Sequence, residues 1–188
     1  MKKENFQKIT DLRHNLHMYP ELSMQERETA ERIKTFLRDN THFRIVDRGD
    51  WFTDNGGWFY AFKEGRKPGQ KIAFRADMDA LPITEDDALS YHSRNAGVSH
   101  KCGHDGHCAA LCGLALELDA KETDSDIYLI FQPGEETGSG ALFCREIDSG
   151  RGHHASIRLS QPGWLPGGEC RISPRAYAAG IGRTSDLF

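Results

Sequence analysis

The densest group of side chains able to bind a metal or transfer a proton lies in His100–His107, which reads HKCGHDGH. In extended backbone, side chains two residues apart point to the same side, so His100, Cys102 and His104 are placed to face one site. Thiolate and imidazole are preferred ligands of zinc-type ions, and the intervening glycines allow the backbone to approach closely. The pattern predicts a metal site, although not a zinc finger, because no second Cys or His pair follows at finger spacing. The alternative is a polar loop whose histidines are only solvated.

A second group is the adjacent pair Glu135 and Glu136, which follows the apolar run Ile127 to Phe131 and the dipeptide Pro133-Gly134. Adjacent carboxylates repel each other, so their position at the end of a buried strand favours a neutralising cation. One carboxylate would then bind the metal while the other handles protons. An exposed acidic turn is the alternative interpretation of this pair.

A third group contains Asp77 and Asp79, which follow the β-like segment Lys71 to Arg75 and share one side of an extended chain. On their own they are equally consistent with a salt bridge to Arg75 at the end of a strand. Three polar groups at the ends of three apparent strands favour one shared site over three unrelated clusters.

The first element expected to position these groups is a helix over Glu4 to Met18. Its apolar residues recur every three or four positions and form one stripe, and Pro20 ends the pattern. The stripe consists of Phe6, Ile9, Leu12 and Leu16.

A second helix is expected to begin near Ser23 and Glu26, whose spacing is that of a capping box. In that motif the hydroxyl and the carboxylate bind free amide groups at the start of the helix. The buried face of this helix would consist of Ala30, Ile33 and Leu37.

Strands and a third helix complete the expected domain. The strands are predicted at Phe43 to Val46, Trp58 to Phe62, Lys71 to Arg75 and Ile127 to Phe131, and the helix at Cys108 to Leu118. The last strand is a continuous apolar run, as expected for a strand covered on both faces. Helices interleaved with such strands predict an α/β layered domain with catalytic groups at the strand ends. No periodic segment is evident after about Ile147.

Composition excludes several classes of protein. The 188 residues include 24 Lys and Arg against 28 Asp and Glu, without a basic block, which argues against nucleic acid as a partner. No apolar run approaches the roughly 20 residues of a membrane span, and the first ten residues do not resemble a signal peptide. These features predict a cytoplasmic protein without a membrane partner. The five cysteines are then expected to be reduced thiols or metal ligands.

Four segments resemble successive motifs of the M20 metallopeptidases, specifically the amidohydrolase branch that removes acyl groups from N-acyl amino acids. They are LRHNLHMYPELSMQE (12–26), FRADMDALPITE (74–85), HKCGHDGHCAAL (100–111) and IFQPGEETGSGA (130–141). Order and approximate spacing agree over residues 12–141. The resemblance implies a layered α/β catalytic domain of zinc-peptidase type, with a central mixed sheet flanked by helices and incomplete at its C-terminus.

The resemblance also implies roles for individual residues. Cys102, His104 and Glu136 would be metal ligands, Glu135 the general base and acid, and Asp79 a carboxylate that orients a neighbouring ligand. The family uses a pair of divalent ions, commonly Zn, Mn, Co or Ni, and a mixed sulfur, nitrogen and oxygen donor set does not select among them. The implied partner is a small-molecule N-acyl amino acid, and a homo-oligomer is compatible with the family.

The resemblance weakens after Ala141. The family continues with a His-Asn-Leu-Pro-Gly segment whose histidine is a further ligand, but counting back from Pro162 places that position on Leu159, which cannot bind a metal. His153 and His154 are the nearby substitutes. We therefore expect residues 1–147 to be the N-terminal part of a metallohydrolase catalytic domain. Residues 148–188 would be a divergent Gly/Arg-rich tail, with the lid domain and the rest of the catalytic domain absent.

The expected activity is metal-dependent hydrolysis of the amide bond of N-acyl amino acids. Because the chain is short, we expect its turnover to be impaired. Two alternatives stay open. One is a catalytically inactive metal-binding fragment, and the other is a dipeptidase of the same family.

Overall fold

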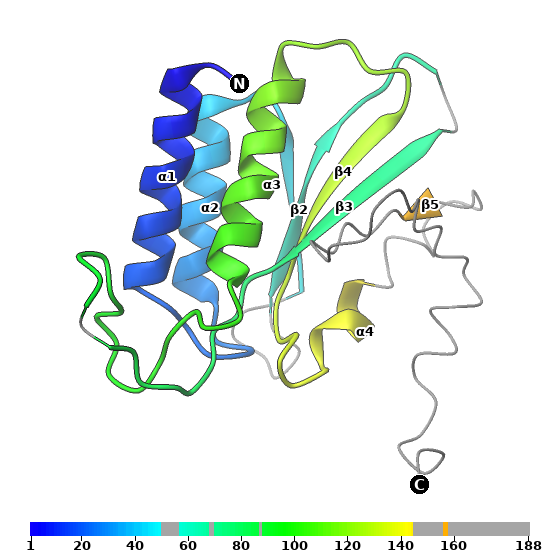
Figure 1. The fold of residues 1–188 in the computed structure, drawn as a ribbon. Helices are drawn as coiled ribbons and strands as arrows, with labels where there is room; N and C mark the ends of the chain where they lie inside the picture. Colours follow the sequence, from blue (N-terminus) through cyan, green and yellow to red (C-terminus); the bar gives the residue numbers. More distant parts are fainter. Residues whose placement is uncertain (50–56, 68–69, 87, 145–155, 158–188) are drawn as a thin grey trace, which may run out of the picture.

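Three helices lie side by side against one face of a mixed β-sheet in the computed structural model (Figure 1). The structure describes residues 1–49, 57–67, 70–86, 88–144 and 156–157. Their elements are α1 (Lys3–Met18), α2 (Arg27–Asn40), β1 (Arg44–Arg48), β2 (Trp58–Lys63), β3 (Lys71–Asp77), α3 (His104–Asp119), β4 (Asp126–Gln132), α4 (Gly140–Cys144) and β5 (Ser156–Ile157). The predicted layered α/β arrangement is confirmed for these ranges.

The sheet has the strand order β1-β2-β4-β3-β5. β2 pairs antiparallel with β1 and β4, whereas β3 runs parallel to β4 and to β5, so the sheet is mixed as expected. Leu129 and Phe131 of β4 are buried in the main cluster and Ile130 in a second one, so both faces of the strand are covered, which explains its continuous apolar sequence. Asp77 is aligned with Gln132 at the carboxyl ends of β3 and β4, so the loops after both strands leave the same edge. Among the elements in the described residues, the short β5 and the short helix α4 were not anticipated by the sequence pattern.

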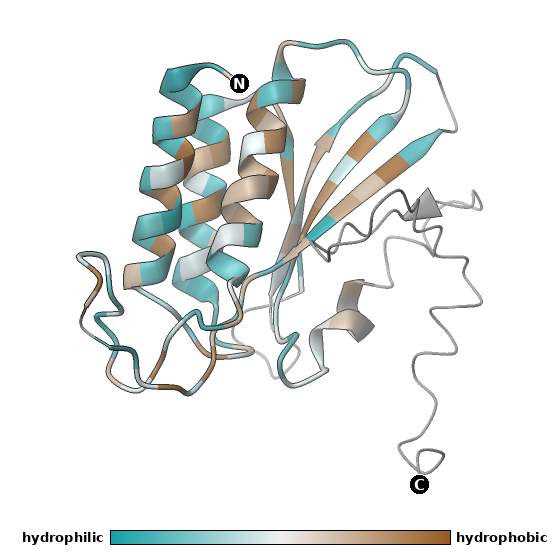
Figure 2. Ribbon diagram, in the orientation of Figure 1, coloured by the Kyte–Doolittle hydropathy of each residue, from teal (hydrophilic) through white to brown (hydrophobic). Residues whose placement is uncertain are grey.

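The main core lies between the helices and the sheet. One set of its side chains comes from the helices, namely Leu12, Leu16, Ala30, Ile33, Leu37, Leu111 and Ala115. They pack on Phe59, Leu129 and Phe131 of the strands, and the rings of Phe59 and Phe131 stack with centroids 4.7 Å apart. Figure 2 shows the hydrophobic character of β2, β3 and β4 beside the largely hydrophilic α1. Burial of each large side chain contributes about 1.5–3 kcal/mol to folding.

Two details of the predicted helices are wrong. Phe6 belongs to the expected apolar stripe of α1, yet it is 61% exposed, because it lies near the free end of the helix. The capping box at the start of α2 does not form either. The carboxylate of Glu21 instead accepts hydrogen bonds from the backbone N–H groups of Glu28 and Thr29, at 3.3 and 2.6 Å. Ser23 and Glu26 are thereby released for contacts elsewhere.

Among the helices in the described ranges, none combines the length and the apolar character needed to cross a membrane.

Candidate metal centre

Loops from separate parts of the chain converge at the carboxyl ends of β3 and β4. Figure 1 shows the loop after β3, the loop after β4 and the beginning of α3 at the same end of the sheet. These segments carry the three polar groups that the sequence singled out. Parallel pairing of β3 with β4 is the reason that they meet, because it brings both strand ends to one edge.

Cys102, His104 and Glu136 form a compact donor cluster. One potential ligand atom from each lies within 4.8 Å of those of the other two. His104 Nε2 is 3.9 Å from Glu136 Oε1 and also 3.9 Å from Glu135 Oε2. Ligand atoms about 2.0–2.3 Å from a tetrahedral zinc lie roughly 3–4 Å from one another, so small side-chain movements suffice for joint coordination. The chemistry and the size of the cluster fit a divalent cation.

Asp79 fixes the orientation of the His104 ring. His104 Nδ1 lies 2.9 Å from the Asp79 carbonyl oxygen and 3.1 Å from its Oδ1, and both oxygens only accept. The proton of the neutral ring is therefore on Nδ1, which leaves the lone pair of Nε2 directed at the carboxylates of Glu135 and Glu136. A metal-binding histidine held by a carboxylate through its second nitrogen is the usual arrangement in metalloproteins.

Asp79 also connects three segments of the chain. It is fully buried, and its Oδ2 accepts hydrogen bonds from Ser23 Oγ at 2.7 Å and from the Glu136 backbone N–H at 2.9 Å. Burial opposes ionisation, but the contacts with His104, Glu136 and Ser23 together lower the pKa of Asp79. Ser23 thus serves the site rather than the start of α2.

Glu26 supports the loop that carries the two adjacent glutamates. Its carboxylate is buried, and Oε1 accepts a hydrogen bond of 2.7 Å from the Gly134 backbone N–H. Burial raises the pKa of Glu26 to about 7 despite that bond. The loop also needs Gly140, because a Cβ there would lie 1.5 Å from the Pro133 carbonyl oxygen.

Gly103 allows the turn between the two ligand candidates of the middle motif. Its φ of +89° is in the left-handed region that favours glycine, and it is the N-cap residue of α3. The chain therefore reverses direction after Cys102 and places His104 in the first helical turn. The helix begins four residues earlier than the sequence pattern predicted.

Negative charge is crowded at this edge of the sheet. Partial desolvation of the thiol and the neighbouring Glu136 raise the pKa of Cys102 to about 11. Burial and the charge of Asp77 also raise the pKa of Glu135. Burial disfavours the protonated His104 ring, but Asp79 raises its pKa to about 9. A bound divalent cation would reverse this balance and favour the thiolate and the neutral ring.

Other predicted residues lie elsewhere. The expectation that His100 faces the same site as Cys102 and His104 is wrong, because a hydrogen bond from Gly103 N–H to the His100 carbonyl makes a turn where extended backbone was assumed. The buried His100 ring lies near His17, with centroids 6.3 Å apart. Asp77 binds Arg75 at 3.1 Å, which confirms the salt-bridge alternative for this aspartate. The positions 153, 154 and 159 lie outside the described residues.

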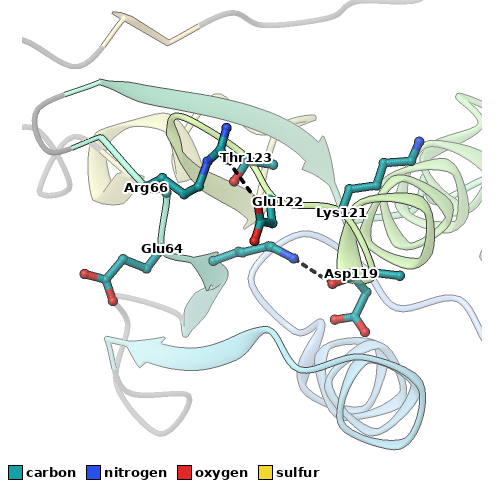
Figure 3. A pocket seen from close by; sticks show the side chains of 9 residues that line it. Glu64, Arg66, Asp119, Lys121, Glu122 and Thr123 are labelled. Atoms are coloured by element: carbon teal, nitrogen blue, oxygen red, sulfur yellow. Dashed lines mark hydrogen bonds and ion pairs between the residues drawn. The ribbon is translucent and has the colours of Figure 1, made fainter.

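A pocket of about 430 Å³ lies at the opposite edge of the sheet (Figure 3). It is lined by residues at the ends of β2 and α3 together with the loop between α3 and β4. Lys63 Nζ donates there to the Leu118 and Asp119 carbonyls at 2.8 and 2.7 Å, and Arg66 pairs with Glu122 at 2.9 Å. This pocket has no part in the donor cluster.

Sequence reasoning missed several residues around the site. Ser23 and Glu26 were assigned to a helix cap, and no role was given to His17, Glu85 or Asp105. The available signal was their location, because all except Asp105 lie within or at the end of the first two family-like segments, and Asp105 directly follows a proposed ligand.

Comparison with known proteins identifies the family. Residues 73–179 match the peptidase family M20/M25/M40. The chain belongs to this family. An N-acetylcysteine deacetylase of Bacillus subtilis is 34% identical to this M20 chain over 178 residues, which cover 94% of the chain and 46% of that enzyme. An N-acetyl-L-cysteine deacetylase of the same organism is 41% identical over 135 residues, or 71% of the chain and 31% of that protein.

Solved structures agree with this assignment. The crystal structure of the Bacillus subtilis YXEP protein, a dinuclear metal-binding peptidase from the M20 family, superposes with a TM-score of 0.75 at 35% identity. The match covers 85% of this chain and 43% of that protein. A putative aminohydrolase from Staphylococcus aureus has a TM-score of 0.67 at 34% identity, covering 84% of this chain and 41% of the other. The M20 chain spans less than half the length of these relatives.

Proposed function

We propose that this chain forms part of a metal-dependent amidohydrolase that cleaves N-acyl amino acids to a carboxylic acid and a free amino acid. The observation that supports this most directly is the Cys102, His104 and Glu136 cluster, within 4.8 Å, with Glu135 beside it. The two deacetylase relatives support an N-acetylated amino acid, and N-acetylcysteine in particular, as the substrate to test first.

In this proposal Cys102, His104 and Glu136 are metal ligands, and Asp79 is a positioning residue for His104. When bound, divalent ions polarise the amide carbonyl and make water more acidic. Glu135 accepts a proton from the attacking water and delivers it to the amine nitrogen as the C–N bond breaks. Proton transfer of this kind contributes typically 10²- to 10⁴-fold in rate. The metal is Zn, Mn, Co or Ni, and the YXEP relative supports a pair of ions.

The proposal extends to the organisation of the chain. Residues 1–147 would be the first part of the catalytic domain, since all the proposed ligands and Glu135 fall within them. Residues 148–188 would be a more divergent, Gly/Arg-rich continuation of the same family sequence, because the family match extends to residue 179.

Hydrolysis of N-acetyl-L-cysteine by the purified protein, with each of the four metals added in turn, tests this function. We expect release of acetate and cysteine that a chelator abolishes and added metal restores. Glu135→Gln should retain metal binding and lose at least about 100-fold in turnover. Glu122→Gln, at the opposite edge of the sheet, is the matched control and should be unchanged.

Other results would select an alternative. Metal binding by the wild-type protein without turnover of any N-acyl amino acid would reject the proposed activity and favour an inactive metal-binding fragment. Cleavage of dipeptides in preference to N-acetyl amino acids would favour a dipeptidase. Full activity of the Glu135→Gln variant would reject the role of Glu135.

A further inference from the structure

A buried carboxylate, Glu85, lies behind the turn that carries Cys102. Its side chain is only 4% exposed, although it belongs to the loop between β3 and α3. Three donors surround it: the Ser93 backbone N–H at 2.8 Å, Lys101 Nζ at 3.1 Å and His17 Nε2 at 3.1 Å. Burial opposes its ionisation, but these donors lower the pKa of Glu85 to about 2. It is therefore a charged carboxylate with a complete set of partners.

His17 carries this contact to the other side of the metal-binding turn. Its Nε2 faces Glu85, and its Nδ1 lies 2.8 Å from Asp105 Oδ2. Carboxylates only accept, so each ring nitrogen that carries a proton donates to the carboxylate that it faces. Arg13 Nε adds a further contact to Asp105 Oδ2 at 3.3 Å. A continuous series of polar contacts thus runs from α1 to the first turn of α3.

The network holds the proposed ligands from both flanks. Lys101 immediately precedes Cys102, and Asp105 immediately follows His104. His104 has an independent anchor, because its Nδ1 is held by Asp79. Cys102 is exposed and lies in the turn before the helix, where the contact between Lys101 and Glu85 restrains its neighbour. Loss of Glu85 should therefore affect the sulfur ligand more than the imidazole ligand.

We propose that Glu85, acting with His17, is the positioning residue that holds the Cys102 turn in its metal-binding conformation. This inference rests on the metal site of the proposed function. Residues that orient ligands in this way typically alter metal affinity 10- to 100-fold when they are replaced.

Titration of the full chain with Co²⁺ tests the inference without relying on turnover. A thiolate ligand gives Co²⁺ a sulfur-to-metal charge-transfer band, whereas imidazole and carboxylate ligands do not. We expect Glu85→Gln to lower the Co²⁺ affinity 10- to 100-fold and to weaken this band relative to the d–d bands. Asp119→Asn is the matched control, because that carboxylate also binds a histidine, His42 at 2.9 Å, but lies at the opposite edge of the sheet.

A second variant separates positioning from folding. Lys101→Met removes the link between Glu85 and the turn while leaving the buried pair of Glu85 and His17 in place, and Lys101 is 42% exposed. It should keep the wild-type melting temperature and still lose charge-transfer intensity. If both variants show the charge-transfer band at its wild-type intensity, the positioning role of Glu85 is rejected while the metal site itself stands. A wild-type protein that binds Co²⁺ without this band would overturn the metal site, and the inference with it.

Discussion

Charged residues are arranged differently at the two ends of the sheet, the end with the pocket and the end with the proposed metal-ligand cluster. At the edge with the pocket, charges of opposite sign pair in solvent, as in Arg66 with Glu122 and Lys67 with Asp124. At the other edge, a thiol and two carboxylates lie around the imidazole of His104. Exposed ion pairs contribute little to stability or chemistry. Thiol, imidazole and carboxylate groups that lie together without a Lys or Arg partner are, in contrast, suited to bind a metal cation. The imbalance of charge, rather than the number of charges, distinguishes the two edges.

The largest expected effect comes from removing the central donor of the crowded edge. His104→Ala should reduce Zn²⁺ affinity by at least about 300-fold, if one of three donors provides about a third of the roughly 10 kcal/mol or more typical of structural zinc sites. Competition with a chromophoric chelator measures this affinity. Glu122→Gln should bind Zn²⁺ like the wild type. Equal Zn²⁺ affinity in the wild type and His104→Ala would show that the cluster around His104 does not bind the metal.

The next effect concerns the pH dependence of stability. Glu26 has a folded pKa of about 7 against an ordinary value of 4.5, so the folded state keeps a proton that the unfolded state releases. Its favourable contribution is complete below pH 4.5 and disappears as the pH rises through 7, a change on the order of 3 kcal/mol. Glu26→Gln, which still accepts from Gly134, should remove this dependence and be the more stable protein at pH 8.

Urea unfolding at pH 5 and pH 8 provides the measurement for this variant. Glu28→Gln, an exposed neighbour on α2, serves as the control and should follow the wild-type pH dependence. Parallel pH profiles of the wild type and Glu26→Gln would show that Glu26 does not titrate in this range.

A smaller effect is expected at Ser23. Ser23→Ala removes the hydroxyl that donates to the buried Asp79 carboxylate at 2.7 Å, and a hydrogen bond to a charged group contributes about 1.5–3 kcal/mol. We expect a loss of about 2 kcal/mol in the free energy of unfolding. Ser125→Ala, where the hydroxyl binds Gln70 at 3.3 Å on the surface, should change it by less than about 0.5 kcal/mol. Similar losses in both variants would contradict the special role of Ser23.

The smallest effect belongs to the paired edge. Arg66→Met breaks ion pairs with Glu122 and Asp124 in which all three side chains are substantially exposed. Such pairs typically contribute about 0–1 kcal/mol, and salt screens them. The free energy of unfolding in urea should therefore fall by less than about 1 kcal/mol, and 1 M NaCl should abolish the difference. A salt-independent loss above 2 kcal/mol would show that this edge is more than a solvated surface.

The sequence predicted the layers of the fold because periodicity reports burial directly. The apolar run of β4 indicated a strand covered on both faces, and the structure buries its alternate side chains in two separate hydrophobic clusters. The pairing of the strands could not be predicted in the same way, since the order β1-β2-β4-β3-β5 depends on contacts between residues that are far apart in the sequence. The family resemblance, rather than spacing, suggested the mixed sheet.

The site shows a similar division. The family-like motifs predicted Cys102, His104 and Glu136 as metal ligands, and the structure places their donor atoms close together. The assumption of extended backbone failed at His100, because the turn at Gly103 depends on a left-handed φ that alternation cannot reveal. Ser23 was misassigned because a serine three residues before a glutamate looks the same whether it caps a helix or binds a distant aspartate. Such long-range hydrogen bonds leave no local pattern.

The central place of β4 has a consequence for how the protein is made. β4 is synthesised after β2 and β3, yet it pairs with both. While residues 126–132 are still inside the ribosome, the earlier strands lack their common neighbour, and Glu136 has not yet emerged. We therefore expect nascent chains to expose the apolar edges of β2 and β3 for some time. Chaperone binding at that stage, rather than the final stability, would then limit how much folded protein a cell obtains.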